Sequence, residues 1–137
     1  MLITEMLSRN AQKYPNKVSL IEREPEKNIR RQITWLEFEN ESNRLANALR
    51  SFGVLPGDKV ALLMMNCLEW LPVYFGILKT GALAAPLNFR FTAKEIGKCT
   101  EMSESKILIY GPEFQERIEK IQNKGTCIEK FIYVGTD

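Results

Sequence analysis

The sequence predicts an α/β fold: a mostly parallel β-sheet flanked by helices and preceded by a small N-terminal β-hairpin. From Lys59 onward, short apolar runs of strand length alternate with segments of helical length, in the order β-α-β-α-β-α-β. Such alternation implies parallel strands joined by right-handed crossovers. Upstream, residues 18–22 and 29–33 have strand character, and the charged segment between them contains Pro25. This pattern predicts a hairpin at the edge of the fold.

The chain begins with a predicted helix that Thr4 caps and Pro15 ends, because a residue before proline is disfavoured in the α region. Its apolar positions are Leu2, Met6, Leu7 and Ala11. A second helix begins at Thr34, which forms a capping box with Glu37. Its predicted buried face consists of Phe38, Leu45, Leu49 and Phe52. Gly53 ends this helix, as a left-handed glycine commonly does.

The next elements are a strand over residues 59–65 and a helix over 68–80. The strand is almost continuously apolar, which is typical of a strand covered on both faces. The helix is apolar nearly all round, so it belongs in a core. Asn66 is its predicted cap, and Pro72 within it predicts a kink. A buried strand over residues 82–87 follows.

The last third of the chain repeats this arrangement. Thr92 and Glu95 form another capping box, which begins a helix extending to about residue 102. A strand over residues 106–110 comes next, and Pro112 then begins the first turn of a helix. The inward positions of that helix are Phe114, Ile118 and Ile121. Residues 131–134 are the last predicted strand.

Composition excludes several classes of protein. The length of 137 residues is that of one domain, and the net charge of +2 comes without a basic block, so no nucleic-acid partner is predicted. The three cysteines (Cys67, Cys99 and Cys127) form no C-x-x-C pair, which argues against a disulfide framework or a zinc site and favours a reducing, cytoplasmic location. No uncharged stretch approaches the roughly 20 residues that span a bilayer. The N-terminus does not have the pattern of a signal peptide.

The sequence offers no catalytic residue and no metal ligand. It contains no histidine, so Ser-His and Cys-His mechanisms are excluded for these residues. It also lacks the nucleophile elbow, the Walker loop and the dinucleotide-binding glycine pattern. Helix capping explains Asn66 better than a site role does. For Trp70, Tyr74 and Phe75, core packing is favoured over an acyl pocket. The cysteines are predicted to be inert thiols, because no basic neighbour lowers their pKa.

One ordered series of segments identifies a family. It consists of I-T-W-L-E-F, N-R-L-A-N-A-L-R-S-F-G-V-L-P-G-D-K-V-A-L-L, N-C-L-E-W, I-L-K-T-G-A-L-A-A-P-L-N and F-T-A-K-E-I. The series resembles the N-terminal region of the adenylate-forming (AMP-binding) superfamily, which includes acyl-CoA synthetases, adenylation domains of peptide synthetases and luciferases. The match is collinear over roughly residues 2–110, is most like acyl-CoA synthetases, and fades after Gly111.

The resemblance implies acyl activation in two steps. A carboxylate attacks the α-phosphate of ATP to give an acyl-adenylate and pyrophosphate, and a thiol, usually coenzyme A, then displaces AMP. In the family, the phosphate loop, the Mg²⁺ ligand and the catalytic lysine lie downstream of the matched region, and none is found in this sequence. The chain therefore resembles a partial N-terminal subdomain, with residues 1–57 forming the helices and hairpin and residues 58–137 the sheet core.

The same resemblance implies that the isolated chain is inactive and binds no cofactor tightly. Its partners are then the rest of its own polypeptide and, in the full-length enzyme, a carboxylic acid. An isolated piece of this kind is expected to expose apolar surface and to self-associate or be marginally stable. Two alternatives stay open: a complete, non-catalytic α/β module that binds a nucleotide or a protein, and an adenylation domain that loads a carrier protein.

Arg90 is the one candidate site residue. It lies in P-L-N-F-R-F, after the strand over residues 82–87, and ligands of open α/β sheets bind outside such strand ends. In some CoA-ligating relatives, the arginine of a matching P-L-N-x-R stretch touches the nucleotide phosphate of coenzyme A, a role that suits a guanidinium. The resemblance therefore implies a coenzyme A phosphate contact for Arg90. The other interpretation is a solvated arginine in a surface ion pair.

Overall fold

The computed structural model describes residues 1–135, and the chain divides into two compact units. The N-terminal unit comprises residues 1–54 and 66–80; the sheet unit comprises residues 55–65 and the chain from residue 81 onward. The elements of the N-terminal unit are α1 (Ile3–Lys13), β1 (Val18–Glu24), a 3₁₀ turn (Pro25–Lys27), β2 (Ile29–Thr34), α2 (Trp35–Ser51) and α3 (Trp70–Lys79). The elements of the sheet unit are β3 (Lys59–Leu63), β4 (Leu83–Pro86), α4 (Ala93–Met102), β5 (Ser105–Tyr110), a 3₁₀ turn (Pro112–Phe114), α5 (Gln115–Lys124) and β6 (Lys130–Tyr133).

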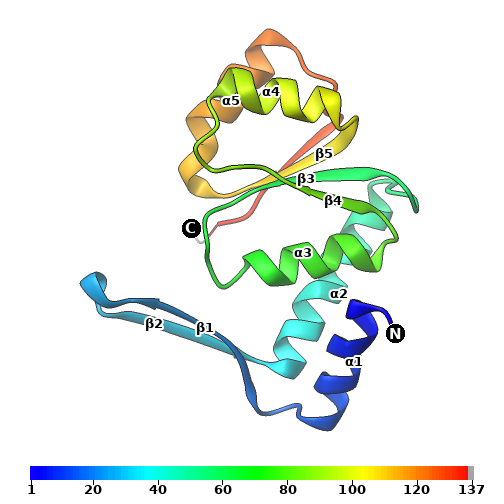
Figure 1. The fold of residues 1–137 in the computed structure, drawn as a ribbon, viewed down its shortest axis with the longest axis vertical. Helices are drawn as coiled ribbons and strands as arrows, with labels where there is room; N and C mark the ends of the chain where they lie inside the picture. Colours follow the sequence, from blue (N-terminus) through cyan, green and yellow to red (C-terminus); the bar gives the residue numbers. More distant parts are fainter. Residues whose placement is uncertain (136–137) are drawn as a thin grey trace. The chain divides into compact units, whose positions relative to one another are not determined.

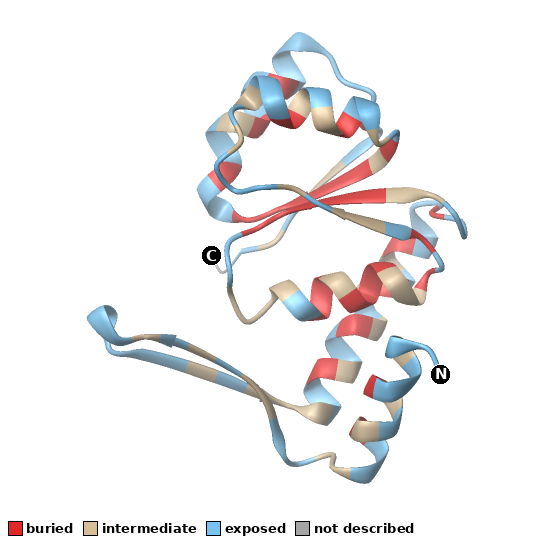
Figure 2. Ribbon diagram, viewed as in Figure 1, coloured by how far each residue is buried: buried red, intermediate tan, exposed pale blue. Residues whose placement is uncertain are grey.

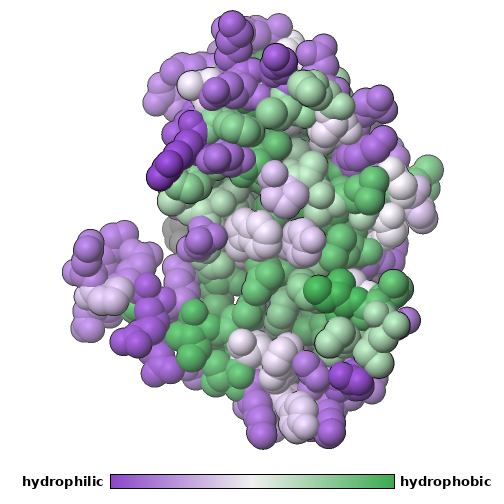
Figure 3. All heavy atoms as spheres, viewed as in Figure 1, coloured by the Kyte–Doolittle hydropathy of each residue, from purple (hydrophilic) through white to green (hydrophobic). Residues whose placement is uncertain are grey.

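The predicted hairpin is present in the N-terminal unit. β1 and β2 pair antiparallel, with Glu22 opposite Arg31. Asn28 closes the turn in the left-handed conformation (φ 52°), which asparagine tolerates better than most residues do. Hydrophilic side chains gather at the tip of the hairpin, at the left of Figure 3.

The helices of the N-terminal unit share a cluster of buried apolar side chains. Leu7, Phe38 and Phe75 are buried together, and the rings of Phe38 and Phe75 meet edge to face with centroids 5.1 Å apart. α2 and α3 approach closely at Gly76, where an added Cβ would lie 2.9 Å from the Leu45 side chain. A small residue at this position therefore sets the spacing of the two helices.

A polar cluster accompanies this core. The Lys79 ammonium lies 2.8 Å from the carboxylate of Glu39 and donates to Asn43 at 2.9 Å. Glu39 also accepts a hydrogen bond from the hydroxyl of Ser8 at 2.8 Å. The ion pair is mostly buried, since the side chains of Lys79 and Glu39 are only 12% and 15% exposed. It connects α1, α2 and α3.

The capping box of α2 is confirmed. The Thr34 hydroxyl accepts from the Glu37 N–H at 3.2 Å, and the Glu37 carboxylate accepts from the Thr34 N–H at 2.7 Å. The predicted face is only partly right, because Phe52 is 41% exposed and Leu45 is half-buried. The buried residues of α2 are Phe38, Ser42, Ala46 and Leu49. The buried face of α2 therefore includes the small residues Ser42 and Ala46, where the sequence predicted the larger Leu45 and Phe52.

Two predictions about helix termini are wrong. The N-cap of α1 is Leu2 and not Thr4, and among the positions predicted to be apolar contacts only Leu7 and Ala11 are buried. Asn66 does not cap α3, because that helix begins later, after Glu69, and has no side-chain cap. Pro72 therefore lies in the first turn of α3, where its missing N–H has no partner to lose, and the reason for expecting a kink disappears.

The sheet unit has the predicted parallel architecture. The strand order is β4-β3-β5-β6, and all neighbouring pairs are parallel. α4 and α5 lie together on one face of the sheet (Figure 1). The capping box of α4 is confirmed, with the Thr92 hydroxyl accepting from the Glu95 N–H at 3.3 Å. The inward face of the last helical segment is also confirmed, since Phe114, Ile118 and Ile121 are all buried.

Burial differs sharply between central and edge strands (Figure 2). Along β3 and β5, Val60, Leu63 and Leu108 are 0% exposed. The prediction that residues 82–87 form a buried strand is wrong, because β4 lies at the edge and its Leu83 is 57% exposed. The sheet therefore has a continuous apolar centre and two partly exposed edges. No helix within residues 1–135 is both long and apolar enough to cross a membrane.

Candidate functional site

The carboxyl ends of all four parallel strands lie at one edge of the sheet. In open α/β sheets, ligands bind outside this edge, near the point where the strand order reverses. Here the chain goes from β3 to its neighbour β4 and then crosses to β5 on the other side of β3. The reversal point therefore lies between β3 and β5, next to the segments that leave β3, β4 and β5.

The predicted site residue Arg90 lies at this edge, in the loop that leaves β4. Leu87 donates its N–H to the Leu62 carbonyl at 2.8 Å, so sheet pairing continues past the end of the strand. A turn follows, in which the Phe91 N–H donates to the Asn88 carbonyl at 3.0 Å. The side-chain oxygen of Asn88 accepts from the Arg90 N–H at 2.9 Å. The backbone of Arg90 is therefore held within a tight turn.

The guanidinium of Arg90 is exposed to solvent. Its carbon lies 5.4 Å from the ring centroid of Phe89, and among residues 1–135 no carboxylate forms an ion pair with it. The surface ion pair of the alternative interpretation is thus not made by the part of the chain that the structure describes. An exposed guanidinium at a strand-end edge can donate forked, charge-assisted hydrogen bonds to an anion.

Sequence reasoning missed Arg117, on α5. Its Nη1 donates to the carbonyls of Phe89 at 2.6 Å and of Phe91 at 3.1 Å, the two residues that flank Arg90. These contacts join positions 28 and 26 residues apart. No local pattern could have indicated them, because arginine on the surface of a helix is common.

Two tyrosines also lie at the strand ends. The Tyr110 hydroxyl donates to the Gln115 side chain at 3.0 Å, and its ring meets that of Tyr133 edge to face, with centroids 5.7 Å apart. Burial, more than the nearby Tyr133 and Glu119, raises the pKa of Tyr110 above its usual value. This phenol therefore stays protonated near neutral pH and serves as a hydrogen-bond donor.

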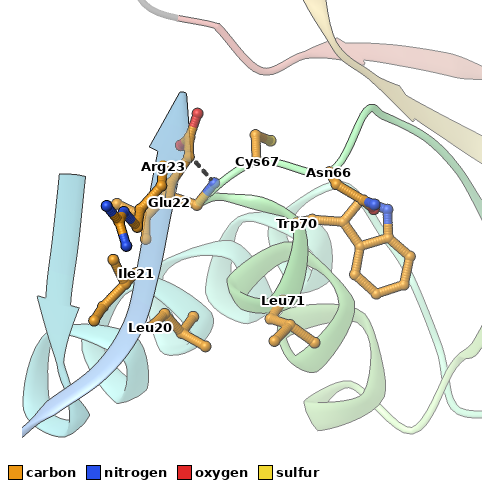
Figure 4. A pocket seen from close by; sticks show the side chains of 9 residues that line it. Leu20, Ile21, Glu22, Arg23, Asn66, Cys67, Trp70 and Leu71 are labelled. Carbon is orange, nitrogen blue, oxygen red and sulfur yellow. Dashed lines mark hydrogen bonds between the residues drawn. The ribbon is translucent and has the colours of Figure 1, made fainter. Parts of the chain in front are cut away.

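The N-terminal unit contains a separate cavity of about 370 Å³ between β1 and the segment that begins α3 (Figure 4). Leu20 and Ile21 line it from β1, and Trp70 and Leu71 line it from α3. Asn66 also lines this cavity and is exposed. Asn66 is therefore not a cap and lies in the wall of this cavity, which Glu22 and Arg23 also line.

Arg31 forms ion pairs with residues in and next to the lining of this cavity. Its guanidinium pairs with Glu22 on the neighbouring strand and with Glu69 before α3, the latter at 2.7 Å. Glu22 in turn accepts from the N–H of Leu68 at 2.9 Å, the hydrogen bond drawn in Figure 4. The hydrogen bond from Arg31 is the main cause that lowers the pKa of Glu69. One positive and two negative charges thus fix the hairpin to the start of α3.

The three aromatic residues of α3 have different surroundings. Phe75 belongs to the buried core and Tyr74 packs against it, so the packing prediction is confirmed for these two residues. Trp70 stacks on Tyr74, with centroids 5.3 Å apart, and also lines the cavity. Burial raises the pKa of the neighbouring Cys67 thiol to about 11, which agrees with the inert thiol that the sequence predicted.

The described residues do not offer a metal site. Within residues 1–135, no group of three or more Cys, Asp or Glu side chains converges in a way that could hold an ion. The three cysteines are free, and Cys127 is exposed.

Comparison with known proteins identifies the family. The model of the "AMP-binding enzyme" family matches residues 7–136. The chain is similar to the long-chain-fatty-acid–CoA ligase FadD13 of Mycobacterium tuberculosis, with 36% identity over 99 residues, which cover 72% of this chain and 19% of that protein. It is also 35% identical to the fatty acid–[acyl-carrier-protein] ligase ScoC of Streptomyces coeruleorubidus, over 66% of this chain and 18% of that protein.

A solved structure gives the same result. The inhibitor-bound N-terminal domain of FACL13 from Mycobacterium tuberculosis superimposes with a TM-score of 0.85 and 31% identity, covering 96% of this chain and 33% of that one. The chain thus spans about a fifth of the length of the curated relatives it matches. Its sequence and its fold are thus similar to those of these proteins, and the chain belongs to the AMP-binding enzyme family.

Proposed function

We propose that this chain is the N-terminal part of an ATP-dependent acyl-CoA ligase that forms an acyl-adenylate and then a thioester. The observation that carries the proposal is the 36% identity to a long-chain-fatty-acid–CoA ligase within a family match over residues 7–136. Fatty or aryl acids are the proposed substrates, and ATP and coenzyme A the co-substrates. The cysteines are all free, which agrees with the proposed cytoplasmic location.

The residues of this chain do not fit the Mg²⁺ that the family implies, because no acidic cluster forms among residues 1–135. They also include no histidine and no glycine-rich phosphate loop. The chain is therefore proposed to supply scaffold and one binding edge, while adenylate chemistry depends on residues outside it. We expect the 137-residue chain alone to be inactive and to bind no nucleotide tightly.

For the binding edge, we assign Arg90 to the nucleotide phosphate of coenzyme A. Three observations support this: the loop lies at the carboxyl end of the sheet, the backbone of Arg90 is held in a turn, and its guanidinium has no carboxylate partner among residues 1–135. A phosphate presents the oxygen geometry that a guanidinium fork matches. The role of Arg90 is confined to the thioester step.

Transfer to a carrier protein is a second candidate function, favoured by the 35% identity to the carrier-protein ligase ScoC. The two candidates differ in chemistry at Arg90. Free coenzyme A carries a nucleotide phosphate, whereas the phosphopantetheine arm of a carrier protein carries none. A requirement for Arg90 therefore favours coenzyme A as the acceptor.

The activity is tested on the polypeptide encoded by the whole reading frame that contains residues 1–137. We expect carboxylate-dependent release of pyrophosphate from ATP, and then a thioester with coenzyme A. A thioester only on a carrier protein would establish the second candidate. Release of pyrophosphate by the isolated 137-residue chain would contradict the proposed division of labour.

Arg90→Ala tests the binding edge in the same protein. We expect the KM for coenzyme A to rise several-fold to about a hundredfold, as expected for about 1–3 kcal/mol of charged hydrogen bonding. Adenylate formation without coenzyme A should stay near wild type. Lys98→Ala, which removes an exposed charge on α4, is the control and should change neither step. A parallel fall in both half-reactions would show that Arg90 is structural.

Exposed apolar side chains support a covering by further polypeptide. Leu83 on edge strand β4 is 57% exposed, Tyr133 on edge strand β6 is 45% exposed, and Ile21 on the hairpin is 50% exposed. We propose that later segments of the same protein pack on these residues. The isolated chain should then self-associate in sedimentation experiments. A monomer at high concentration would argue for a finished domain.

A further inference from the structure

The loop that carries Arg90 is anchored at both ends by hydrogen bonds that do not involve Arg117. Leu87 is paired to β3 at its start, and Thr92 begins α4 at its end, with its N–H donating to the Glu95 carboxylate at 2.7 Å. Between these anchors only four residues remain. The direction of the Arg90 side chain therefore depends on how these few peptide groups are oriented.

Arg117 orients two of those peptide groups. Its Nη1 donates to the carbonyl of Phe89, in the peptide group that precedes Arg90, at 2.6 Å, and to the carbonyl of Phe91, in the peptide group between residues 91 and 92, at 3.1 Å. Charge-assisted hydrogen bonds are stronger than neutral ones, so they resist rotation of the two peptide planes. Arg90 lies between the two peptide groups that Arg117 fixes.

Arg117 is itself well anchored. It is half-buried on α5, and its guanidinium carbon lies 5.3 Å from the ring centroid of Phe114. Phe114 is 1% exposed and belongs to the buried core of the sheet unit. The Arg117 guanidinium therefore connects the buried core to the exposed residues 88–90, beside the contact that Phe91 itself makes with that core.

We propose that Arg117 is a positioning residue for coenzyme A: it aims Arg90 by holding the carbonyls on either side of it, without contacting the coenzyme. This inference rests on the proposed role of Arg90. A positioning residue that acts through Arg90 alone has a definite signature. Its removal weakens binding of coenzyme A only while Arg90 is present.

The experiment is a double-mutant cycle on the full-length protein, with Arg90→Ala, Arg117→Met and the double variant. Methionine preserves the apolar bulk over Phe114 and removes the donors. We expect Arg117→Met to raise the KM for coenzyme A about 3- to 30-fold, the effect of losing part of a charged hydrogen bond. Adenylate formation without coenzyme A should stay within about twofold of wild type. The double variant should have about the KM of Arg90→Ala alone.

Two controls make the result specific. Lys120→Met removes a charge one turn further along α5, from an exposed pair with Glu116, and should leave the KM unchanged. Arg117→Lys keeps a charged donor and should retain more affinity for coenzyme A than Arg117→Met. As a readout that needs no coenzyme, hydrogen exchange of the amides in residues 88–92 should accelerate in Arg117→Met and not in Lys120→Met.

The outcomes are distinguishable. If Arg90→Ala leaves the KM for coenzyme A unchanged, the proposed Arg90 site falls, and this inference with it. If Arg90→Ala acts but Arg117→Met changes neither the KM nor the exchange of residues 88–92, the inference alone is overturned. Effects that multiply in the double variant would also overturn it, because Arg117 would then act on the coenzyme independently.

Discussion

Different interactions stabilise the interior of each of the two units. The sheet unit has a continuous apolar core of nine buried residues between its strands and helices α4 and α5, including Leu108, Phe114 and Ile118. The N-terminal unit also buries apolar side chains, among them Leu7, Phe38 and Leu49, but adds a mostly buried ion pair, Lys79–Glu39, and the charged cluster of Arg31 with Glu22 and Glu69. One unit relies mainly on apolar burial, and the other relies substantially on paired charges.

This difference matters for the proposed function. Arg117 packs on the buried Phe114 and holds the loop by donating to the carbonyls of Phe89 and Phe91, not to a carboxylate. Arg31 is held by two carboxylates, which neutralise it. An edge that must bind an anion benefits from the first arrangement. A hairpin that must only be held in place is served by the second.

The largest expected effect comes from the apolar core of the sheet unit. Leu108→Ala should lower the free energy of unfolding by about 3–5 kcal/mol, because a fully buried leucine leaves a cavity that the packed strands cannot close. Leu7→Ala is the matched change in the N-terminal unit and should cost about 2–3 kcal/mol, since Leu7 lies on the terminal helix α1, which can move to close part of the cavity. Urea denaturation of the full-length protein measures both. Equal losses would contradict the contrast between the units.

The next effect concerns the buried ion pair. Lys79→Met should lower the free energy of unfolding by about 2–3 kcal/mol, because it leaves the mostly buried Glu39 carboxylate without its cation. Adding Glu39→Leu should recover most of that loss, since an apolar pair of similar size is often as stable as a buried ion pair. Thermal melting of the single and double variants decides the question. If the double variant is less stable than the single one, the pair is not the cause.

Sequence reasoning was most accurate where the determining contacts are local. The capping boxes at Thr34 and Thr92 depend on residues three positions apart, and both are present. The alternation of strands and helices predicted the parallel sheet, because each strand–helix–strand crossover places its two strands parallel. Arg90 lies in the loop after β4, as the position of P-L-N-F-R-F behind a predicted strand indicated, and its binding role stays a prediction.

The wrong or missing predictions have a common cause: contacts between residues far apart in the sequence decided which of several locally possible structures formed. Asn66 has the chemistry of a cap, but Arg31 binds Glu69 and Glu22 binds the Leu68 N–H, which fixes residues 66–69 outside the helix. β4 was predicted to be buried because its residues are apolar, and only the strand order reveals that it is an edge. Arg117 could not be predicted, because its partners lie 26 and 28 residues away.

Helix capping should affect the two units alike, because here the local chemistry is the same. Thr34→Ala and Thr92→Ala should each lower the free energy of unfolding by about 1 kcal/mol, by removing one cap acceptor. Thr34→Ser and Thr92→Ser retain the hydroxyl and should cost less. Urea denaturation is again the measurement. A difference above about 1 kcal/mol between the two alanine variants would show that tertiary context, not the cap, sets the cost.

The smallest effect is a pH dependence specific to the charged cluster of the N-terminal unit. The hydrogen bond from Arg31 lowers the pKa of Glu69 in the folded chain, so the carboxylate stabilises the fold at pH values above its unfolded pKa of about 4.3. This stability is lost as the pH falls through the lower folded pKa. The hydrogen bond to Glu69 also raises the pKa of Arg31, so the guanidinium stays charged throughout. Because the Glu69 side chain is 35% exposed, solvent screening limits the effect to less than about 1 kcal/mol.

Glu69→Gln tests this, because glutamine does not titrate. The difference in unfolding free energy between wild type and Glu69→Gln should be largest above about pH 5 and should shrink toward zero near about pH 3. Glu41→Gln is the control, since Glu41 pairs with Arg44 on the exposed face of α2 and such pairs contribute little. A Glu69→Gln difference that stays constant from about pH 3 to 7 would mean that the lost contact is steric and not ionic. The Arg31 cluster would then stabilise the N-terminal unit by packing and not by charge. The Lys79–Glu39 pair would remain as the ionic contribution that distinguishes this unit from the sheet unit.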